Sequence, residues 1–131
     1  MNLLLDTNAL ILFFEGSSNL SNNAKAAIES SNKIIFVSVI SFWEIALKTS
    51  ISKLEMNLSM EELEKMVWEN GFEILPIGII HTLGLRTLNY YHKDPFDRMI
   101  IQQALVENLN IVSSDSAFDQ YFINTPIKRI W

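Results

Sequence analysis

Short apolar runs that alternate with helical stretches constrain the fold of this chain more than any other feature of its sequence. Residues 3–5 and 34–39 are apolar at nearly every position, so they present apolar side chains on both faces. Strands of that kind occur in parallel sheets that helices cover on both sides. Further strands are predicted at residues 72–77, 111–113 and 127–130. The alternation therefore predicts an α/β fold with a central, mostly parallel sheet.

Helical segments fill the intervals between these strands. They are predicted at residues 7–14, 21–30, 41–48, 59–70, 81–88 and 94–108. The fourth begins with a capping-box sequence at Ser59 and stops at Gly71, and the last begins at Asp94-Pro95. The sequence contains no repeat and no interdomain linker, so residues 1–131 are predicted to form a single domain.

Composition excludes several classes of protein. The chain has no cysteine, which excludes disulfides and thiolate metal sites. Apolar stretches fall short of the roughly 18 residues of a membrane span, and Asp6 interrupts the N-terminal run where a signal peptide would continue. We therefore expect a cytoplasmic protein with no membrane contact. The net charge of −5 argues against a nucleic-acid binder, unless several carboxylates are gathered in one metal site.

Four carboxylates occupy equivalent places in this scheme. Asp6 follows the first predicted strand, and Asp115 follows the fourth. Glu44 and Asp97 lie in the first turns of the third and last predicted helices. The carboxyl ends of the strands in an open α/β sheet meet in one crevice, where ligands bind. We therefore predict that the four side chains face a single cleft.

Each acid also has a simpler explanation, because helix N-termini favour acidic and hydroxyl side chains. Ser41 and Glu44 match a capping box, and Asp97 stands at a favourable position after Asp94-Pro95. Asp6 and Asp115 match N-caps. Capping is served equally well by Ser, Thr or Asn, however, and it gives no reason for acids to recur at one end of the sheet.

A cluster of four carboxylates requires a compensating cation. Two charges ~4 Å apart repel each other by about 4 kcal/mol at an effective dielectric near 20. Mg²⁺ and Mn²⁺ prefer oxygen ligands, and Mg²⁺ commonly completes its shell with substrate phosphate. The pattern therefore indicates phosphoryl-transfer or phosphodiester chemistry.

Four segments resemble the signatures of a known family. They are L-L-L-D-T-N-A-L, S-F-W-E-I-A-L-K, H-K-D-P-F-D-R-M-I-I-Q-Q-A and I-V-S-S-D. In order and spacing they are similar to PIN-domain nucleases, above all to VapC-type toxins of type II toxin–antitoxin systems. The resemblance implies a three-layer α/β/α PIN-like fold and Mg²⁺- or Mn²⁺-dependent endoribonuclease activity. It assigns the catalytic and metal-binding roles to the same four acids: Asp6, Glu44, Asp97 and Asp115.

The resemblance also implies partners, namely an RNA substrate, a cognate antitoxin protein and a second copy of the chain in a homodimer. Four polar residues are predicted to support the carboxylates: Thr7, Asn8, Asp94 and Ser113. Asp94 is predicted to do so by capping the last helix, and the alternative for Thr7, Asn8 and Ser113 is an ordinary residue of a turn or helix start. Three basic residues are candidate contacts to the RNA backbone, against the alternative of ordinary surface charge: Lys48, Lys93 and Arg98. His81 and His92 are predicted to be isolated structural residues, because metal-assisted hydrolysis requires no histidine base.

Other interpretations fit less well. A haloacid-dehalogenase-type phosphatase needs a second aspartate at the position of Asn8, and a receiver domain needs an acidic pair where Leu5 precedes Asp6. The serious alternative is a PIN-fold module that binds RNA or protein without catalysis. Cleavage that depends on a divalent cation distinguishes this module from a nuclease.

Overall fold

One parallel sheet forms the centre of the molecule. The computed structural model describes residues 1–30 and 32–131, and within them five strands pair in the order β3-β2-β1-β4-β5. The strands are β1 (Leu3–Leu5), β2 (Ile35–Ser38), β3 (Glu73–Leu75), β4 (Asn110–Val112) and β5 (Arg129–Ile130). Each neighbouring pair is parallel, which confirms the predicted α/β class.

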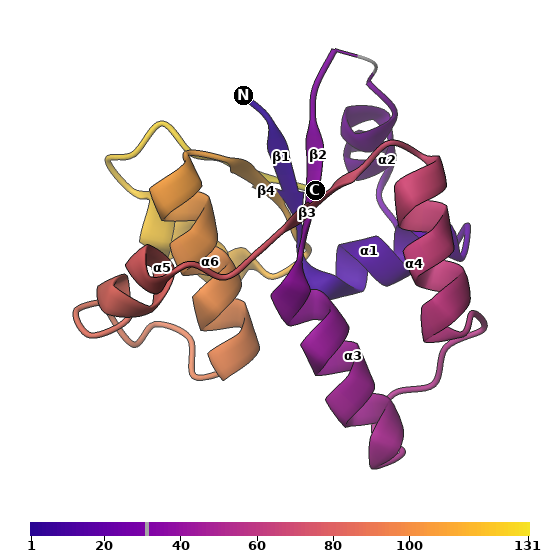
Figure 1. Ribbon diagram of the computed structural model, residues 1–131. Coiled ribbons are helices and arrows are strands. Elements are labelled where there is room, and N and C mark those ends of the chain that lie inside the picture. Colours follow the sequence, from indigo (N-terminus) through magenta and orange to yellow (C-terminus); the bar gives the residue numbers. More distant parts are fainter. Residues whose placement is uncertain (31) are drawn as a thin grey trace.

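Helices cover both faces of this sheet (Figure 1). They are α1 (Thr7–Phe14), α2 (Asn22–Glu29), α3 (Val39–Ser50), α4 (Met60–Glu69), α5 (Ile79–Gly84) and α6 (Pro95–Glu107), with a 3-10 helix η1 (Ser116–Phe122) after β4. Figure 1 shows α1, α2 and α4 on one side of the sheet and α5 and α6 on the other. The arrangement is the three-layer α/β/α architecture that was predicted.

The alternation of side chains along the strands creates two separate cores. Leu3 and Leu5 pack with residues of α1, α2 and α4, whereas Leu4 points the other way and packs with residues of α6 and η1. All three leucines are fully buried. Strands that bury both faces read as continuous apolar runs, which explains why β1 was recognisable from the sequence.

Hydroxyl and acidic side chains begin several of the helices. Asp6 accepts a hydrogen bond from the amide of Ala9 at the start of α1, and Asp94 accepts one from the amide of Asp97 at the start of α6. The predicted capping box of Ser59 and Glu62 is present at the start of α4. These contacts satisfy amide groups that the first turn of a helix leaves without partners.

The start of α3 differs from the prediction. The N-cap is Ser38, whose hydroxyl accepts a hydrogen bond from the amide of Ile40, and the helix begins at Val39. The predicted capping box of Ser41 and Glu44 is therefore wrong. Because β2 passes into α3 without a loop, Glu44 lies in the second turn of the helix instead of the first.

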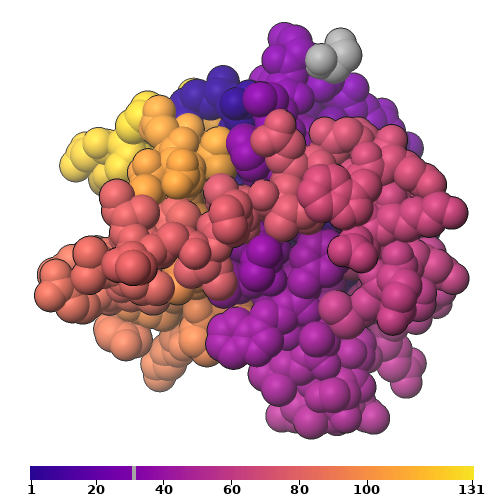
Figure 2. Space-filling view, in the orientation of Figure 1, coloured from indigo at the N-terminus to yellow at the C-terminus, as the bar shows by residue number. Residues whose placement is uncertain are grey.

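Two segments project from the body of the molecule. In the space-filling view, α3 (purple) extends below the sheet, and α5 with the loop after it (salmon) forms a protruding edge (Figure 2). The buried side chain of Gln103 in α6 joins these regions, since it contacts Ser38 at the start of α3 and donates to the carbonyl of Pro76 after β3. Within the described residues, no helix is long and apolar enough to cross a membrane.

Candidate functional site

The carboxyl ends of the central strands carry two of the predicted acids. Asp6 directly follows β1, and its amide donates to the carbonyl of Val112 at the end of β4 (3.1 Å). Asp115 follows β4 and caps η1 through a hydrogen bond from the amide of Ala117 (3.0 Å). Both acids are therefore N-caps, as the alternative interpretation predicted, and both also stand at the crevice end of the sheet.

The other two acids come from helices, and the acidic cleft is the region among the four side chains, Asp6, Glu44, Asp97 and Asp115. Glu44 projects from α3, and Asp97 projects from the first turn of α6. The charges of Glu44 and Asp115 both raise the pKa of Asp6, and those of Asp6 and Glu44 both raise the pKa of Asp97. Charges act in this way on near neighbours, so Asp6 lies near Glu44 and Asp115, and Asp97 lies near Asp6 and Glu44.

Burial is the main cause of the altered ionisation in this cleft. Asp6 is only 6% exposed, and burial raises its pKa to about 6, although the Ser113 hydroxyl and the Ala9 amide act in the opposite direction. Burial and then the neighbouring charge of Asp94 raise the pKa of Asp97 to about 7, while His92 lowers it. Negative charge in the cleft is therefore only partly compensated by the protein itself.

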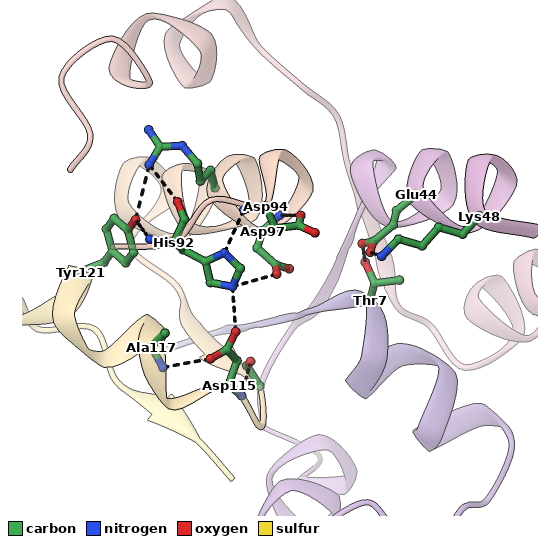
Figure 3. A network of polar contacts seen from close by, with 11 residues as sticks. Thr7, Glu44, Lys48, His92, Asp94, Asp97, Asp115, Ala117 and Tyr121 are labelled. Carbon is green, nitrogen blue, oxygen red and sulfur yellow. Dashed lines mark hydrogen bonds and ion pairs between the residues drawn. The ribbon is translucent and has the colours of Figure 1, made fainter. Parts of the chain in front are cut away.

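Glu44 lies at one side of the cleft in a polar network of its own (Figure 3). The hydroxyl of Thr7 donates to Oε1 of Glu44 (2.6 Å) and lies 2.9 Å from the hydroxyl oxygen of Ser41. The ammonium of Lys48, one helical turn further along α3, forms an ion pair with Oε2 of Glu44. Both carboxylate oxygens of Glu44 therefore have a donor, and its position is fixed from two helices.

His92 lies on the opposite side and bridges two carboxylates. Its Nε2 atom is 2.8 Å from Oδ2 of Asp115 and 3.2 Å from Oδ2 of Asp97 (Figure 3). Its Nδ1 atom accepts a hydrogen bond from the amide of Asp94 (3.1 Å). The proton of the neutral ring is therefore on Nε2, an assignment that follows from these partners, and the imidazole donates it to the acids.

The residues predicted to support the carboxylates fall in different places. Thr7 contacts Glu44, as described above. Ser113 is fully buried, and its hydroxyl accepts a hydrogen bond from the amide of Asp115 (3.1 Å). Asp94 caps α6, which confirms the capping role predicted for it. Asn8 is exposed in the first turn of α1, and its role remains a prediction.

The three basic residues also differ from one another. Lys48 pairs with Glu44, and this pairing raises the pKa of the ammonium group. Lys93 is exposed in the loop before α6. Arg98 is buried, and its guanidinium donates to the carbonyls of Asn89 (2.8 Å) and Leu88 (3.1 Å). The guanidinium of Arg98 therefore supports the loop before α6 and does not stand on the surface as predicted.

The prediction of two isolated histidines holds for one of them. His81 is buried, accepts a hydrogen bond from the amide of Gly78 and lies 3.0 Å from a carboxylate oxygen of Glu107, so it fastens α5 to α6. His92 is instead part of the acidic cleft. The signal that identifies it was present in the sequence, since His92 stands two residues before Asp94 in the H-K-D-P-F-D-R segment.

The donor set of this cleft fits a hard divalent cation. Carboxylate oxygens are the ligands that Mg²⁺ and Mn²⁺ prefer. The neighbouring negative charges, which add to burial in raising the pKa of Asp6 and Asp97, favour a cation here. His92, Asp97 and Asp115 each offer one ligand atom, and these atoms lie within 4.8 Å of one another. Because Nε2 of His92 carries a proton in this arrangement, the ligands that fit are the carboxylate oxygens.

Comparisons with known proteins agree with the fold. A family model described as PIN domain matches residues 3–122. Similar solved structures include a toxin–antitoxin complex from Klebsiella pneumoniae, with 21% identity and a TM-score of 0.62 over 97% of this chain and 95% of that chain. VapBC2 from Rickettsia felis, bound to a DNA fragment from its promoter, has 19% identity and a TM-score of 0.65 over 100% of both chains.

A third similar structure is FitAcB from Neisseria gonorrhoeae, with 18% identity and a TM-score of 0.60 over 97% of this chain and 95% of that chain. Identities at this level show a shared fold. No curated protein matches this chain.

Proposed function

Since this chain belongs to the PIN-domain family, we propose that it is a Mg²⁺- or Mn²⁺-dependent endoribonuclease that hydrolyses RNA phosphodiester bonds. The observation that carries the proposal is the convergence of four carboxylates in one cleft, where burial and mutual repulsion raise the pKa of Asp6 and Asp97. A cleft of this kind attracts a divalent cation, and the cation in turn attracts a phosphate.

In this proposal, the protein holds the reacting groups in place. Asp6, Glu44 and Asp97 bind one cation through oxygen atoms, and Asp115 completes that site or shares a second. When bound, Mg²⁺ or Mn²⁺ polarises a phosphate oxygen and lowers the pKa of a coordinated water. Thr7 and Lys48 orient Glu44, and His92 holds Asp97 and Asp115 in place until a cation takes over their oxygen atoms. Carboxylates that are already held in place lower the entropic cost of reaching the geometry for in-line attack.

The test is cleavage of total RNA by the purified protein with Mg²⁺, with Mn²⁺ and with EDTA. We expect Asp6→Asn and Asp97→Asn each to lower kcat by on the order of 100-fold or more, the scale on which removal of one electrostatic group acts. Asp119→Asn is the matched control, because Asp119 pairs with Arg129 (2.8 Å) outside the cleft. Activity that survives in both cleft variants would overturn the proposal.

The alternative is a PIN-fold module that binds RNA or a protein without cutting. Its expected signature differs from that of a nuclease. RNA would be retained intact with every divalent cation, and the Asp97→Asn change would alter binding without any cleavage to lose. Direct observation of uncut RNA in complex with the wild-type protein would favour this alternative.

We propose further that the protein is the cytoplasmic toxin of a toxin–antitoxin pair, acting as a homodimer with a cognate antitoxin. Support comes from the similar solved structures, two of which are described as a toxin–antitoxin complex and as VapBC2. Expression of the wild-type chain alone should arrest bacterial growth, and expression of Asp97→Asn should not. Co-expression of the small protein encoded beside it should restore growth, and sedimentation should give twice the 15.0 kDa chain mass.

A further inference from the structure

The loop between α5 and α6 presents two aromatic side chains to solvent beside the acidic cleft. Tyr90 is 77% exposed and Tyr91 is 50% exposed. Lys93 is exposed in the same loop, and His92, which contacts Asp97 and Asp115, lies between them. This loop belongs to the protruding edge of Figure 2. An exposed aromatic ring leaves apolar surface in water, which a binding partner can cover.

The ring of Tyr90 is held in place by Arg98. The guanidinium carbon of Arg98 lies 3.8 Å from the centroid of the ring, the distance of a stacked cation–π contact. Arg98 is itself 5% exposed and is anchored to the carbonyls of Leu88 and Asn89. One face of the Tyr90 ring is therefore covered by a rigid support. The high exposure of the side chain leaves the opposite face open to solvent.

The backbone around Tyr90 is also fixed. The hydroxyl of Tyr121 donates to the carbonyl of Asn89 (2.7 Å) and accepts from the amide of His92 (2.8 Å). The ring of Tyr91 packs edge-on against Tyr121, with 5.1 Å between the ring centroids. These contacts hold the loop on both sides of Tyr90. A ligand that stacks on this ring therefore meets a surface that needs little further ordering.

The Tyr90 ring and the Arg98 guanidinium stacked on it form a platform. This platform lies close to the acids along the chain. Tyr90 is two residues from His92, so their Cα atoms are at most about 7 Å apart. The Nε2 atom of His92 is 2.8 Å from Asp115. A shallow pocket of about 220 Å³ is lined by Leu85, Tyr90, Lys93, Pro95 and Arg98. Pro95 belongs to the first turn of α6, which also carries Asp97, so the pocket and the cleft share that turn.

The chemistry of this pocket suits one nucleotide of a single strand. A flat ring with one open face stacks on a base, and the neighbouring ammonium of Lys93 attracts the phosphate. A base within a duplex already has neighbours on both faces and is not free to stack on a protein side chain. In a chain with a net charge of −5, the ammonium of Lys93 gives this exposed ring a cationic neighbour that attracts phosphate.

We propose that Tyr90, supported by Arg98, stacks on an unpaired nucleobase beside the phosphate that is cut, and that Lys93 contacts the adjoining phosphate. This inference rests on the proposed ribonuclease function and deepens it, because it assigns the contact with one base of the RNA to the loop before α6. Stacking tolerates every base, so the platform selects for unpaired structure and not for sequence.

The test compares Tyr90→Ala and Tyr90→Phe in steady-state cleavage of a short single-stranded RNA. We expect Tyr90→Ala to raise KM about tenfold while kcat changes less than about twofold, the size expected for the loss of one stacked base. Tyr90→Phe keeps the ring and should behave as wild type. Trp68→Ala is the matched control, because Trp68 is also exposed (57%) but lies on α4.

A second measurement identifies the stacked base directly. A series of RNAs with one abasic nucleotide moved along the strand should show one position where the wild-type KM rises about tenfold. At that position Tyr90→Ala should cause no further loss, since the two changes remove the same contact. Because the abasic series is measured on the wild-type protein, it still tests for a stacked base if Tyr90→Ala fails to fold.

The outcomes separate the two proposals. If the wild-type protein cuts no RNA with Mg²⁺ or Mn²⁺, the proposed function fails whatever Tyr90 does. If the wild type cuts RNA but neither Tyr90→Ala nor any abasic position changes KM, the stacking site is overturned and the nuclease stands. A Tyr90→Ala variant that loses self-association in sedimentation, with KM unchanged, would assign this surface to a protein contact and would likewise overturn the proposal.

Discussion

The Nε2 atom of His92 lies 2.8 Å from Oδ2 of Asp115, across a sequence separation of 23 residues. The same atom also lies within 3.2 Å of Asp97. A protonated nitrogen therefore stands between two acids from α6 and the β4–η1 junction, at a place where a divalent cation would draw the same oxygen atoms together. The proton of His92 and a cation compete for one pair of carboxylates.

Replacement of His92 by alanine should expose this competition. Without the donor, the two acids repel each other more strongly, and we expect a loss of about 1 kcal/mol in the free energy of unfolding with EDTA present. The rise in melting temperature that Mg²⁺ causes should be larger in His92→Ala than in the wild type, because no donor has to be displaced. Thermal melts with and without Mg²⁺ measure both quantities.

His81→Ala is the matched control for this experiment. His81 is a buried histidine that also contacts a carboxylate, but it joins α5 to α6 outside the cleft. Its loss should lower the melting temperature by the same amount with EDTA and with Mg²⁺. Equal Mg²⁺ responses in His92→Ala and the wild type would contradict the competition.

Stability in the absence of metal should fall as pH rises. The folded-state pKa values of Asp6 (about 6) and Asp97 (about 7) are raised from 3.8. The folded protein therefore binds more protons than the unfolded chain between about pH 4 and pH 7. The stabilisation from these two groups is complete below about pH 4 and is lost as pH rises through 6 and 7. Cation binding needs the ionised carboxylates and should strengthen over the same range.

Urea unfolding at several pH values between 5 and 8, with EDTA or with Mg²⁺, measures the two opposite slopes. Asp97→Asn should flatten the EDTA curve between pH 5 and about pH 7, since the asparagine does not titrate. A curve for Asp97→Asn that remains parallel to that of the wild type would show that Asp97 ionises normally.

Two neighbouring acids on α6 should respond in opposite ways to substitution. Asp94 caps the helix, so Asp94→Ala should lower the free energy of unfolding by about 1 kcal/mol, with or without Mg²⁺. Asp97 makes no capping contact through its own side chain but lies among other carboxylates. Asp97→Asn should therefore leave stability in EDTA unchanged or raise it, and it should reduce the response of the melting temperature to Mg²⁺. Ser59→Ala on α4 provides a capping loss outside the cleft.

The hydroxyl of Thr7 should matter more than the shape of its side chain. Thr7→Val keeps the volume but leaves Oε1 of the buried Glu44 without its donor at 2.6 Å. We expect a loss of about 1–3 kcal/mol in the free energy of unfolding, together with weaker cleavage as Glu44 becomes less well oriented. Thr7→Ser restores the hydroxyl and should recover most of both. A Thr7→Val protein as stable and active as the wild type would remove Thr7 from the site.

The parts of this molecule that local sequence determines were predicted well. The apolar run Leu3–Leu5 predicted a strand buried on both faces, and Asp94-Pro95 predicted the start of α6. The convergence of the four acids followed from topology, because parallel strands deliver their carboxyl ends to one edge. The start of α3 was misplaced, because Ser38 and Ser41 are both good caps and only the end of β2 decides between them.

The contacts that could not be predicted join residues far apart in the sequence. The H-K-D-P-F-D-R segment places His92 close to Asp97 in the sequence, but it gives no sign of the contact with Asp115. That contact forms only because the loop before α6 lies beside the β4–η1 junction. Arg98 stands beside an acid in a polar segment, which is typical of a surface residue. The burial of Arg98 depends on how the 88–94 loop folds over it, and no local sequence pattern indicates that loop conformation.

The central position of β1 also determines when the four acids can come together during synthesis of the chain. Asp6 is synthesised well before β4, the strand that pairs with β1, and before Asp115, which follows β4. The four acids therefore cannot come together until the chain through Asp115 has left the ribosome. A growing chain of this protein carries an incomplete set of acids at every earlier stage.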